Sequence, residues 1–475
     1  MFFNRFFSIK RLAKRVFGLP QRVAALSFPA VHDMKMRLLT LLCLAAAFAA
    51  PGFSSQAKAD DGPIRVLFLG HESEHHNSNL YYPMLSRALG RDAIYFDYVT
   101  SVEEALGDAD YLGKFDALLL YANHGRIEPH QWKNLKDYVE GGSGFVPVHC
   151  ASWCFGNEPG FDKLVGGRFK SHQGAEFAAK IVKPDHPAMK DVKEFTAWDE
   201  TYFHNNHNTE NRTVLMVREA KPGDPHTKPE PWTWVRTQGK GRVFYTASGH
   251  DQRVWSHSDF HQLIKSGILW SVGDKARKRY DNFIAKRTPL KYEKRGNIPN
   301  YERRPEPLQY QLPLSPEDSM KYTQVPVGFR MELFAAEPDV INPIYMAWDE
   351  RGRLWVIETV DYPNEFKDGR KGNDRIKICE DTDGDGKADK FTVFAEGFNI
   401  PTSMTFARGG VILAHAPEFP GLSPERSVGP GVEGPRVTQV EHDAGTPEFP
   451  QCGKHAGGDE RTHGDQDDVR IESFA

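Results

Sequence analysis

The most specific chemical signal in the chain is an acidic loop, DTDGDGKAD, at Asp381–Asp389. It offers carboxylates at alternate or near-alternate positions, from Asp381, Asp383, Asp385 and Asp389. Such spacing surrounds a Ca²⁺ ion with the oxygen ligands that it prefers. The twelfth position is Thr392 instead of Glu, and no helical pattern flanks the loop, so an EF-hand is not expected. The loop predicts a structural calcium site in a turn between strands, with a solvated acidic turn as the alternative.

A second group of polar residues follows the predicted strands of the first half of the chain. In open α/β sheets, ligands bind at the carboxyl ends of the strands. The residues expected at that edge are His71, Glu72, His75 and His76 after the first strand, Asn123 and His124 after the third, His149 and Cys150 after the fourth, and His250 and Asp251 after the last. We therefore expect them to share one crevice.

Three interpretations of these histidines stay open. In the first, His75 or His76, His149, His172 and His250 converge with Glu72, Glu200 or Asp251 to bind a divalent metal, zinc or another transition metal with an open water position. In the second, the same region binds sugar hydroxyls through His75, His76, Asn123, His172, Glu200 and Trp255, with Trp198, Trp232 and Trp255 offering flat faces. In the third, the histidines are hydrogen-bonded anchors of the fold.

Two candidates for catalysis stand out. His250 and Asp251 are a pair for general acid–base work, because a carboxylate can fix the tautomer of an imidazole. Cys150, preceded by His149, follows a buried strand at the point where a strand-to-helix elbow would expose a nucleophile. The elbow lacks flanking glycines and a downstream H-x-E partner, so a small packing residue is the alternative for Cys150. Cys154 lies one helical turn further on.

Alternating strands and helices are expected to position these residues. Near-continuous apolar strands predict a mostly parallel sheet covered on both faces. The strands are expected at 64–70, 94–99, 116–122 and 144–149, with later strand-like segments at 176–182, 214–217, 232–236 and 242–247 extending the sheet. Helices are expected at 83–89, 130–140 and 257–272. The domain is predicted to span residues 62–274.

The second half of the chain has a different character. Residues 275–321 are basic and Pro-rich, which predicts a linker. Residues 322–419 contain short strands separated by Gly and Asp turns, which predicts a partial, propeller-like all-β segment. Residues 420–475 have almost no apolar periodicity. We expect either a disordered tail there or a frame-shifted end of a longer gene, because a propeller needs at least four blades and about one and a half fit.

Composition and the first residues bear on partners and compartment. With 60 basic and 64 acidic residues, the chain has no charge excess of the kind that favours nucleic-acid binding. A basic start, an apolar run and Ala57-Lys58-Ala59 predict a signal peptide at 34–59 and an exported, periplasmic or secreted protein. The run is too short for a stable membrane span. Residues 1–33 are expected to be an upstream extension.

The first domain resembles the ThuA-like family, named for trehalose utilisation. The resemblance lies in GHESEHH at 70–76, the Gly144–Cys150 turn, DHP at 185–187, WDETYFH at 198–204 and GKGRVFYTASGHDQRVW at 239–255. It implies a flavodoxin-like fold of the class I glutamine amidotransferase type and a carbohydrate setting. It does not imply a defined reaction.

Residues 322–418 resemble the start of a putative membrane-bound dehydrogenase domain, a β-propeller of planctomycete-type bacteria. The matching segments are GRLWVIETVDYPN at 352–364, NDRIKICEDTDGDGKADK at 373–390, the turn at 399–402 and GGVILAHAPEF at 409–419. The expected function is disaccharide or keto-sugar utilisation by an exported ThuA-like protein, with or without a metal. The alternative is a non-catalytic scaffold that binds glycans or protein partners, in a truncated dehydrogenase-like protein.

Overall fold

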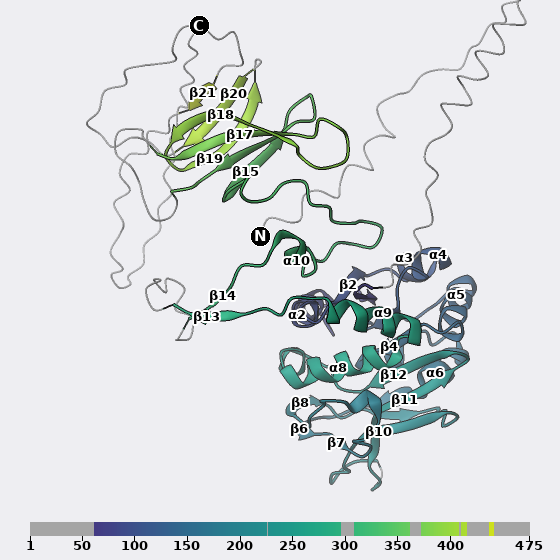
Figure 1. The fold of residues 1–475 in the computed structure, drawn as a ribbon. Helices are drawn as coiled ribbons and strands as arrows, with labels where there is room; N and C mark the ends of the chain where they lie inside the picture. Colours follow the sequence, from purple (N-terminus) through teal and green to yellow (C-terminus); the bar gives the residue numbers. More distant parts are fainter. Residues whose placement is uncertain are drawn as a thin grey trace, which may run out of the picture. The chain divides into compact units, whose positions relative to one another are not determined.

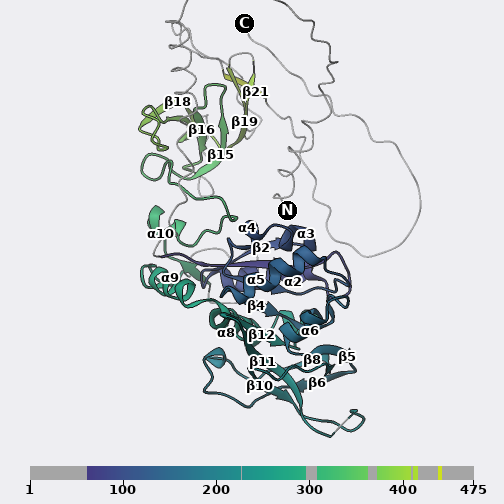
Figure 2. The ribbon, with the colours of Figure 1, turned by 90° about the vertical axis from the view of Figure 1, so that its right-hand side faces the viewer.

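A computed structural model describes residues 61–225, 227–295, 308–361, 372–407, 410–415 and 437–440. The predicted extension and signal peptide therefore lie outside the described residues. No helix among the described ranges has the length and apolar character needed to cross a membrane. Figure 1 and Figure 2 show the ribbon in two views related by a quarter turn.

The first domain is built on a mixed eight-stranded sheet with the order β2-β1-β3-β4-β12-β11-β10-β7. Five strands are parallel: β2 (Ile94–Val99), β1 (Ile64–Leu69), β3 (Ala117–Leu120), β4 (Gly144–Pro147) and β12 (Gly241–Thr246). The antiparallel extension consists of β11 (Glu230–Gln238), β10 (Arg212–Arg218) and β7 (Lys180–Ile181). β3 and β4 are buried at every position, as expected for strands covered on both faces.

Two groups of helices pack around this sheet (Figure 1). One comprises α2 (Ser78–Gly90), α7 (Gln252–Trp255) and α8 (Ser258–Ser271); the other comprises α3 (Val102–Leu106), α4 (Ala109–Leu112) and α5 (Pro129–Glu140). The remaining short elements are α6 (Pro159–Val165), η1 (His149–Trp153) and η2 (Pro187–Met189). Helix α2 begins five residues before the expected start at Pro83, because Asn77 caps it by accepting a hydrogen bond from Leu80 N.

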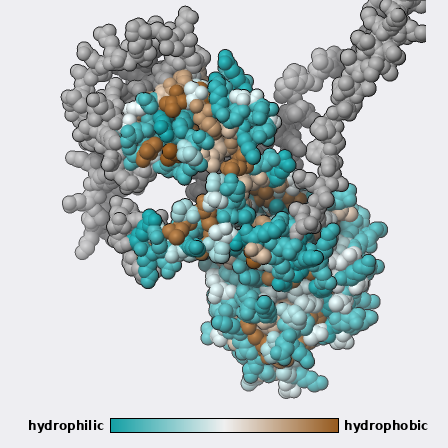
Figure 3. Space-filling view, in the orientation of Figure 1, coloured by the Kyte–Doolittle hydropathy of each residue, from teal (hydrophilic) through white to brown (hydrophobic). Residues whose placement is uncertain are grey.

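Two small antiparallel ribbons complete the domain. One pairs β5 (Arg168–Ser171) with β9 (Phe203–Asn205), and the other pairs β6 (Gly174–Ala178) with β8 (Thr196–Glu200). The single strand expected at 176–182 is thus divided, since β6 pairs with β8 and only β7 joins the main sheet. The division places Glu200 at the end of β8. The outer surface of the domain is mostly hydrophilic in the view of Figure 3.

The range expected to be a linker contains regular structure. It holds α9 (Asp274–Ala285), the strand pair β13 (Tyr292–Lys294) and β14 (Gln309–Gln311), and α10 (Pro316–Met320). Ala276 and Tyr280 of α9 are buried in the core of the first domain. The first turns of the expected linker therefore belong to that core.

The β-rich segment forms two small sheets. The four-stranded one has the order β15 (Pro343–Trp348), β16 (Leu354–Glu358), β17 (Asp374–Glu380) and β18 (Lys390–Phe398); the three-stranded one has the order β19 (Pro401–Ala407), β20 (Gly410–His415) and β21 (Val437–Val440). Strand β21 lies in the range expected to be a tail. The described residues show these small sheets and no propeller, so the propeller stays a prediction.

Candidate metal centre

Four side chains from separate parts of the first domain meet at the carboxyl-end edge of the sheet. His76 follows β1, His149 follows β4, Glu200 ends β8 and His250 follows β12. One potential ligand atom of each lies within 4.8 Å of the others. The topology explains the meeting, because parallel strands end at the same edge and β8 reaches it from the neighbouring ribbon.

His149 is the most constrained of the four. Its φ of 49° places it at the sharp turn between β4 and η1, and its ring stacks on Tyr202 with centroids 4.1 Å apart. Its Nδ1 lies 2.6 Å from the carbonyl oxygen of Ala247, which can only accept, so Nδ1 carries the proton. Burial lowers the pKa of His149 to about 3, so the ring is neutral and its Nε2 carries a lone pair. That lone pair lies 3.2 Å from Glu200 Oε2.

His76 is oriented in the same way. Its Nδ1 donates to Asn123 Oδ1 at 2.8 Å, and its Nε2 lies 3.6 Å from Glu200 Oε2. This Nε2 is buried and has no hydrogen-bond partner among the described residues. Asn123 is itself fixed, since its backbone N donates to Nδ1 of His71 at 3.1 Å. Asn123 thus orients His76, and its predicted sugar contact stays a prediction.

His250 completes the group from the more open side. Its Nδ1 lies 3.3 Å from Glu200 Oε1 but makes no hydrogen bond of acceptable geometry. Burial acts to lower the pKa of His250, but the Glu200 carboxylate outweighs it and raises the pKa overall. Burial likewise acts to raise the pKa of Glu200, and the side chains of His149, His250 and His76 reverse this and lower it, so Glu200 is ionised.

The contacts around Glu200 make this group a candidate site for a metal ion. The Nε2 atoms of His149 and His76, each opposite an Nδ1 that already donates, both face the ionised Glu200 oxygen, and acceptors in contact repel one another unless a positive charge lies between them. A tetrahedral ion with bonds of about 2.0–2.1 Å holds neighbouring ligands roughly 3.3 Å apart. His149 Nε2 and His76 Nε2 lie 3.2 and 3.6 Å from Glu200 Oε2, close to this separation, and His250 Nδ1 lies 3.3 Å from the other carboxylate oxygen, Oε1. Metal-binding histidines usually donate their second ring N–H to a protein acceptor, as His76 and His149 do here.

Two further imidazoles lie at the open side of the centre. His172 follows β5, its Nδ1 is 3.4 Å from Glu200 Oε1, and its side chain is 42% exposed. His75 is exposed and its ring contacts that of His76, with centroids 4.0 Å apart. Burial lowers the pKa of His75. The side chains of His149 and Glu200 are 0% and 6% exposed, so the centre is closed at its base and open toward His172, His75 and His250.

The predicted His250–Asp251 pair is not what the structure shows. The Asp251 carboxylate caps α7 by accepting from Arg253 N at 2.9 Å, and it accepts from Arg253 Nε at 3.0 and 3.1 Å. Glu200 is the carboxylate that faces the His250 ring. Adjacent residues diverge at the end of a strand, which explains why the neighbour in sequence is not the partner in space. Glu72 also lies outside the group and accepts from Asn79 Nδ2.

The tryptophans do not form the expected sugar platform. Trp232 and Trp255 are fully buried, and their Nε1 atoms donate to Ser248 Oγ at 2.7 Å and to the carbonyl of Gly249 at 2.8 Å. Trp198 is partly exposed, but the Arg253 guanidinium lies over its ring at 3.8 Å. The prediction that Trp255 binds substrate is therefore wrong, because a buried ring has no face for a ligand.

Cys150 is not an exposed nucleophile. The positive φ that marks the elbow belongs to His149, one residue earlier, so the turn presents an imidazole to the site. The Cys150 thiol is fully buried, and burial raises its pKa well above the ordinary value. Cys154 is also a buried free thiol and donates to the carbonyl of Ala122 at 2.9 Å. Both cysteines are packing residues.

We expect Cys150→Ala to leave metal content unchanged and to lower the free energy of unfolding by about 1 kcal/mol, since it removes one buried sulfur. Iodoacetamide at pH 8 is expected to leave Cys150 of the folded protein unmodified, because alkylation needs an accessible thiolate. Peptide mass spectrometry before and after denaturation measures this. Rapid alkylation of Cys150 in the native state would contradict the packing role.

In the acidic loop of the β-rich segment, three of the four predicted calcium ligands lie close together. Asp381, Asp383 and Asp385 have carboxylates close enough to share an ion. Asp389 lies outside this group and accepts from Thr382 N at 3.1 Å and from Thr382 Oγ1 at 2.6 Å. Asp381 accepts from the backbone N of Gly384 and Gly386. The calcium site stays a prediction.

Asp199 and Tyr121, two residues that line the centre from behind, were not found by sequence reasoning. The signal for Asp199 was its place beside Glu200 in WDETYFH. Tyr121 ends the apolar run of the third strand and reads there as a core residue. The sequence positions of Asp199 and Tyr121 follow no motif that distinguishes them from core residues.

Comparison with known proteins agrees with this division of the chain. Residues 65–271 match the family model ThuA, described as trehalose utilisation, and residues 315–423 match a domain of unknown function, DUF7133. No curated protein sequence matches the chain significantly.

Solved structures similar to the first domain include two ThuA-like proteins, both described as putative. The one from Parabacteroides merdae has 19% identity and a TM-score of 0.39 over 44% of this chain and 90% of its own. The one from Bacteroides uniformis has 18% identity and a TM-score of 0.39 over 44% of this chain and 91% of its own. Over residues 65–271, the chain is thus similar to the ThuA family of trehalose utilisation.

Proposed function

We propose that the first domain is a metal-dependent enzyme that acts on a carbohydrate, a disaccharide or a keto-sugar. The ion would be held by His76 Nε2, His149 Nε2, His250 Nδ1 and the Glu200 carboxylate. One observation carries the proposal. The ionised Glu200 lies against two imidazole Nε2 atoms whose opposite nitrogens already donate to Asn123 and to the Ala247 carbonyl.

The ligand set favours a transition metal. Neutral imidazole suits Zn²⁺ and the other divalent first-row ions, whereas Ca²⁺ and Mg²⁺ prefer oxygen ligands. One carboxylate leaves a divalent centre with a net positive charge. When bound, such an ion polarises a carbonyl or hydroxyl oxygen, or lowers the pKa of a bound water.

The chain itself provides groups for proton transfer at the open side. His172 is half exposed, lies within 3.4 Å of Glu200 and has no other charged partner among the described residues. An imidazole there can take a proton from a sugar hydroxyl or a water and pass it to solvent. His75 borders the same opening and can donate hydrogen bonds to further hydroxyls.

The carbohydrate part of the proposal is supported by the match of residues 65–271 to the trehalose utilisation family and by the exposed imidazoles of His172 and His75 beside Glu200 and His76. The leader-like residues 34–59 support export of the protein. We also propose that the protein does not bind nucleic acid and that the mature chain has no stable membrane span.

Metal analysis followed by a sugar screen tests this function. The purified protein, stripped with a chelator and titrated with Zn²⁺, Mn²⁺, Co²⁺ or Ni²⁺, is expected to bind about one ion per first domain, as measured by plasma mass spectrometry. Trehalose and other disaccharides, with their keto derivatives, are then incubated with the loaded protein and followed by NMR. Conversion is expected only with metal, and His172→Gln should slow it while leaving metal content unchanged.

The matched control is His130→Gln, which changes an exposed histidine on α5 that pairs with Glu103. Failure of the stripped protein to bind any of these ions at micromolar concentration would overturn the metal centre. Sugar binding by calorimetry without conversion in any metal form would favour the alternative, a non-catalytic glycan-binding scaffold.

A further inference from the structure

We propose that Asp199 is a positioning residue of the metal centre, which holds the ligand His250 in register with the ligand Glu200 through the backbone of Gly249 and His250. The inference rests on the proposed metal site and adds to it a residue that contacts no ion. Asp199 precedes Glu200 on β8, so one dipeptide provides both a ligand and the group that orients another ligand.

The Asp199 carboxylate gathers three backbone donors. Its Oδ2 accepts from Gly249 N at 3.0 Å, and its Oδ1 accepts from His250 N at 3.1 Å and from Glu200 N at 2.9 Å. The two strands that present Glu200 and His250 are therefore joined by one side chain. Burial raises the pKa of the Asp199 carboxyl to about 7, and the hydrogen bonds from the backbone of Gly249, His250 and Glu200 act in the opposite direction.

The carbonyl groups of the same turn are also held by side chains. Tyr121 OH donates to Gly249 O at 2.8 Å and lies 3.2 Å from His250 O, and Trp255 Nε1 donates to Gly249 O at 2.8 Å. Asp199, Tyr121 and Trp255 are all buried. The turn that aims the His250 ring is thus fixed by three side chains from three different elements. This gives Trp255 a role in place of the predicted sugar contact.

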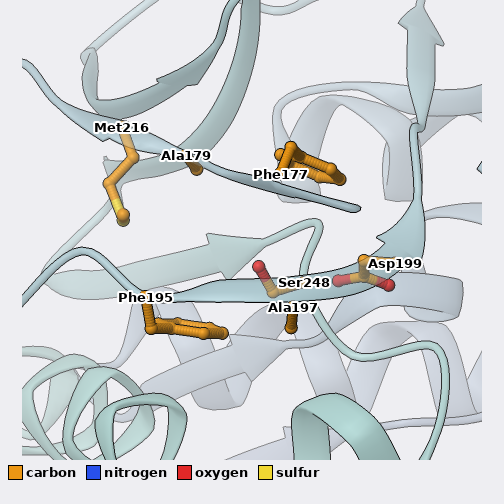
Figure 4. A pocket seen from close by; sticks show the side chains of 7 residues that line it. All are labelled: Phe177, Ala179, Phe195, Ala197, Asp199, Met216 and Ser248. Atoms are coloured by element: carbon orange, nitrogen blue, oxygen red, sulfur yellow. The ribbon is translucent and has the colours of Figure 1, made fainter. Parts of the chain in front are cut away.

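The surroundings of Asp199 keep this arrangement dry. Figure 4 shows Asp199 beside Ser248 in a cavity whose other walls are apolar, formed by Phe177, Ala179, Phe195, Ala197 and Met216. The cavity is about 10 Å³, which is room for a single water molecule at most. Electrostatic hydrogen bonds are stronger where bulk water is excluded.

An amide cannot replace this carboxylate. In Asp199→Asn, one oxygen can still accept, but the amide nitrogen then faces a backbone N–H, donor against donor. The His250 turn has to move to relieve this contact. Groups that orient metal ligands typically change metal affinity by roughly 10–100-fold when they are altered.

The test compares the stripped wild-type protein with Asp199→Asn by titration with Co²⁺. We expect an affinity roughly 10–100-fold lower in the variant, with a changed visible absorption spectrum because the ligand field depends on the position of His250. Far-UV circular dichroism should be unchanged. Tyr121→Phe removes one support of the same turn and should shift the spectrum in the same direction by less. It keeps the inference testable if Asp199→Asn does not fold.

The matched control is Asp116→Asn. Asp116 is also a buried carboxylate and accepts from Arg65 N at 2.9 Å, but it lies at the opposite end of the strands. It should lower stability and leave the Co²⁺ affinity and spectrum unchanged. If Asp199→Asn and Tyr121→Phe bind Co²⁺ as the wild type does, the positioning role is wrong and the metal centre stands. If the wild type binds no ion, the proposed function fails first.

Discussion

Glu200→Gln is expected to lower metal affinity by at least about 100-fold, equivalent to about 2.7 kcal/mol. The substitution keeps the shape of the side chain but removes its negative charge and its anionic ligand atom. The three histidines alone would then hold a doubly charged ion in a buried site with no carboxylate ligand. Isothermal titration of the stripped protein with Zn²⁺ measures the effect directly.

The same substitution is expected to have the opposite effect on the metal-free protein. The glutamine amide can donate a hydrogen bond to His149 Nε2 or His76 Nε2, which Glu200 cannot do while it is ionised. Satisfying a buried acceptor contributes about 1 kcal/mol. Without metal, and at a pH above the raised pKa of His250, Glu200→Gln should thus unfold at the same or a higher denaturant concentration than the wild type. An ion at 100 times its dissociation constant should stabilise the wild type by about 2.7 kcal/mol and the variant by almost nothing.

The pH dependence of the metal-free protein provides a second readout. The pKa of His250 is raised in the folded state because of Glu200. This pair therefore contributes stability below the unfolded-state pKa of His, and the contribution is lost as pH rises through the raised pKa. In Glu200→Gln, this decrease in stability with rising pH should be absent.

The control is Glu176→Gln, which changes an exposed residue of β6 and should retain the metal affinity and the pH dependence of the wild type. Equal metal affinity in Glu200→Gln and wild type would rule out Glu200 as a ligand.

The sequence predicted which histidines lie in this centre better than it predicted which carboxylate faces each of them. Apolar runs that end in polar residues located His76, His149 and His250, because parallel strands must deliver their carboxyl ends to one edge. Sequence adjacency then suggested Asp251 as the partner of His250, whereas Asp251 turns away to cap α7 and bind Arg253. Only the pairing of β6 with β8 brings Glu200 to that place, and strand pairing between ribbons leaves no periodic signal in the residues.

The sequence pattern also did not predict whether a side chain at the end of a strand is buried or exposed. Trp255 and Cys150 have types and positions that suit a binding face and a nucleophile, yet both are fully buried. An aromatic ring or a thiol at the end of a strand is compatible with either environment, since its exposure depends on neighbours from distant elements. For Trp255, those neighbours are Tyr81, stacked at 5.5 Å, and Phe260 at 5.1 Å.

Gly249→Ala is expected to lower both stability and metal affinity, because a side chain in the turn before His250 would have a strained backbone and tight contacts. Gly249 has a φ of 136°, a region that residues with a Cβ rarely adopt. An added Cβ would also lie 3.2 Å from the Cβ of His149 and 3.3 Å from Cγ1 of Val148. Relief of both contacts requires movement of the turn, of the β4 elbow, or of both.

The backbone strain and the tight contacts together are expected to lower the free energy of unfolding by about 3 kcal/mol. The corresponding decrease in melting temperature is about 6–12 °C for a domain of this size. Because the new methyl group would press on the proposed ligand His149 and sit directly before the proposed ligand His250 in the chain, metal affinity should decrease by roughly 10–100-fold as well. Thermal unfolding, monitored by circular dichroism, measures the melting temperature. Titration with Zn²⁺ measures the metal affinity.

Gly223→Ala separates the two causes. Gly223 has a φ of 94°, and a Cβ built there would meet no atom within 4 Å. It should show a loss of stability of about 1–3 kcal/mol from backbone strain alone, with no change in metal affinity. If Gly249→Ala instead resembles Gly223→Ala in retaining full affinity, the turn tolerates displacement and the geometry of the centre does not depend on it. A loss of affinity confined to Gly249→Ala would show that close packing between the β4 elbow and the β12 turn sets the distance between two of the ligands.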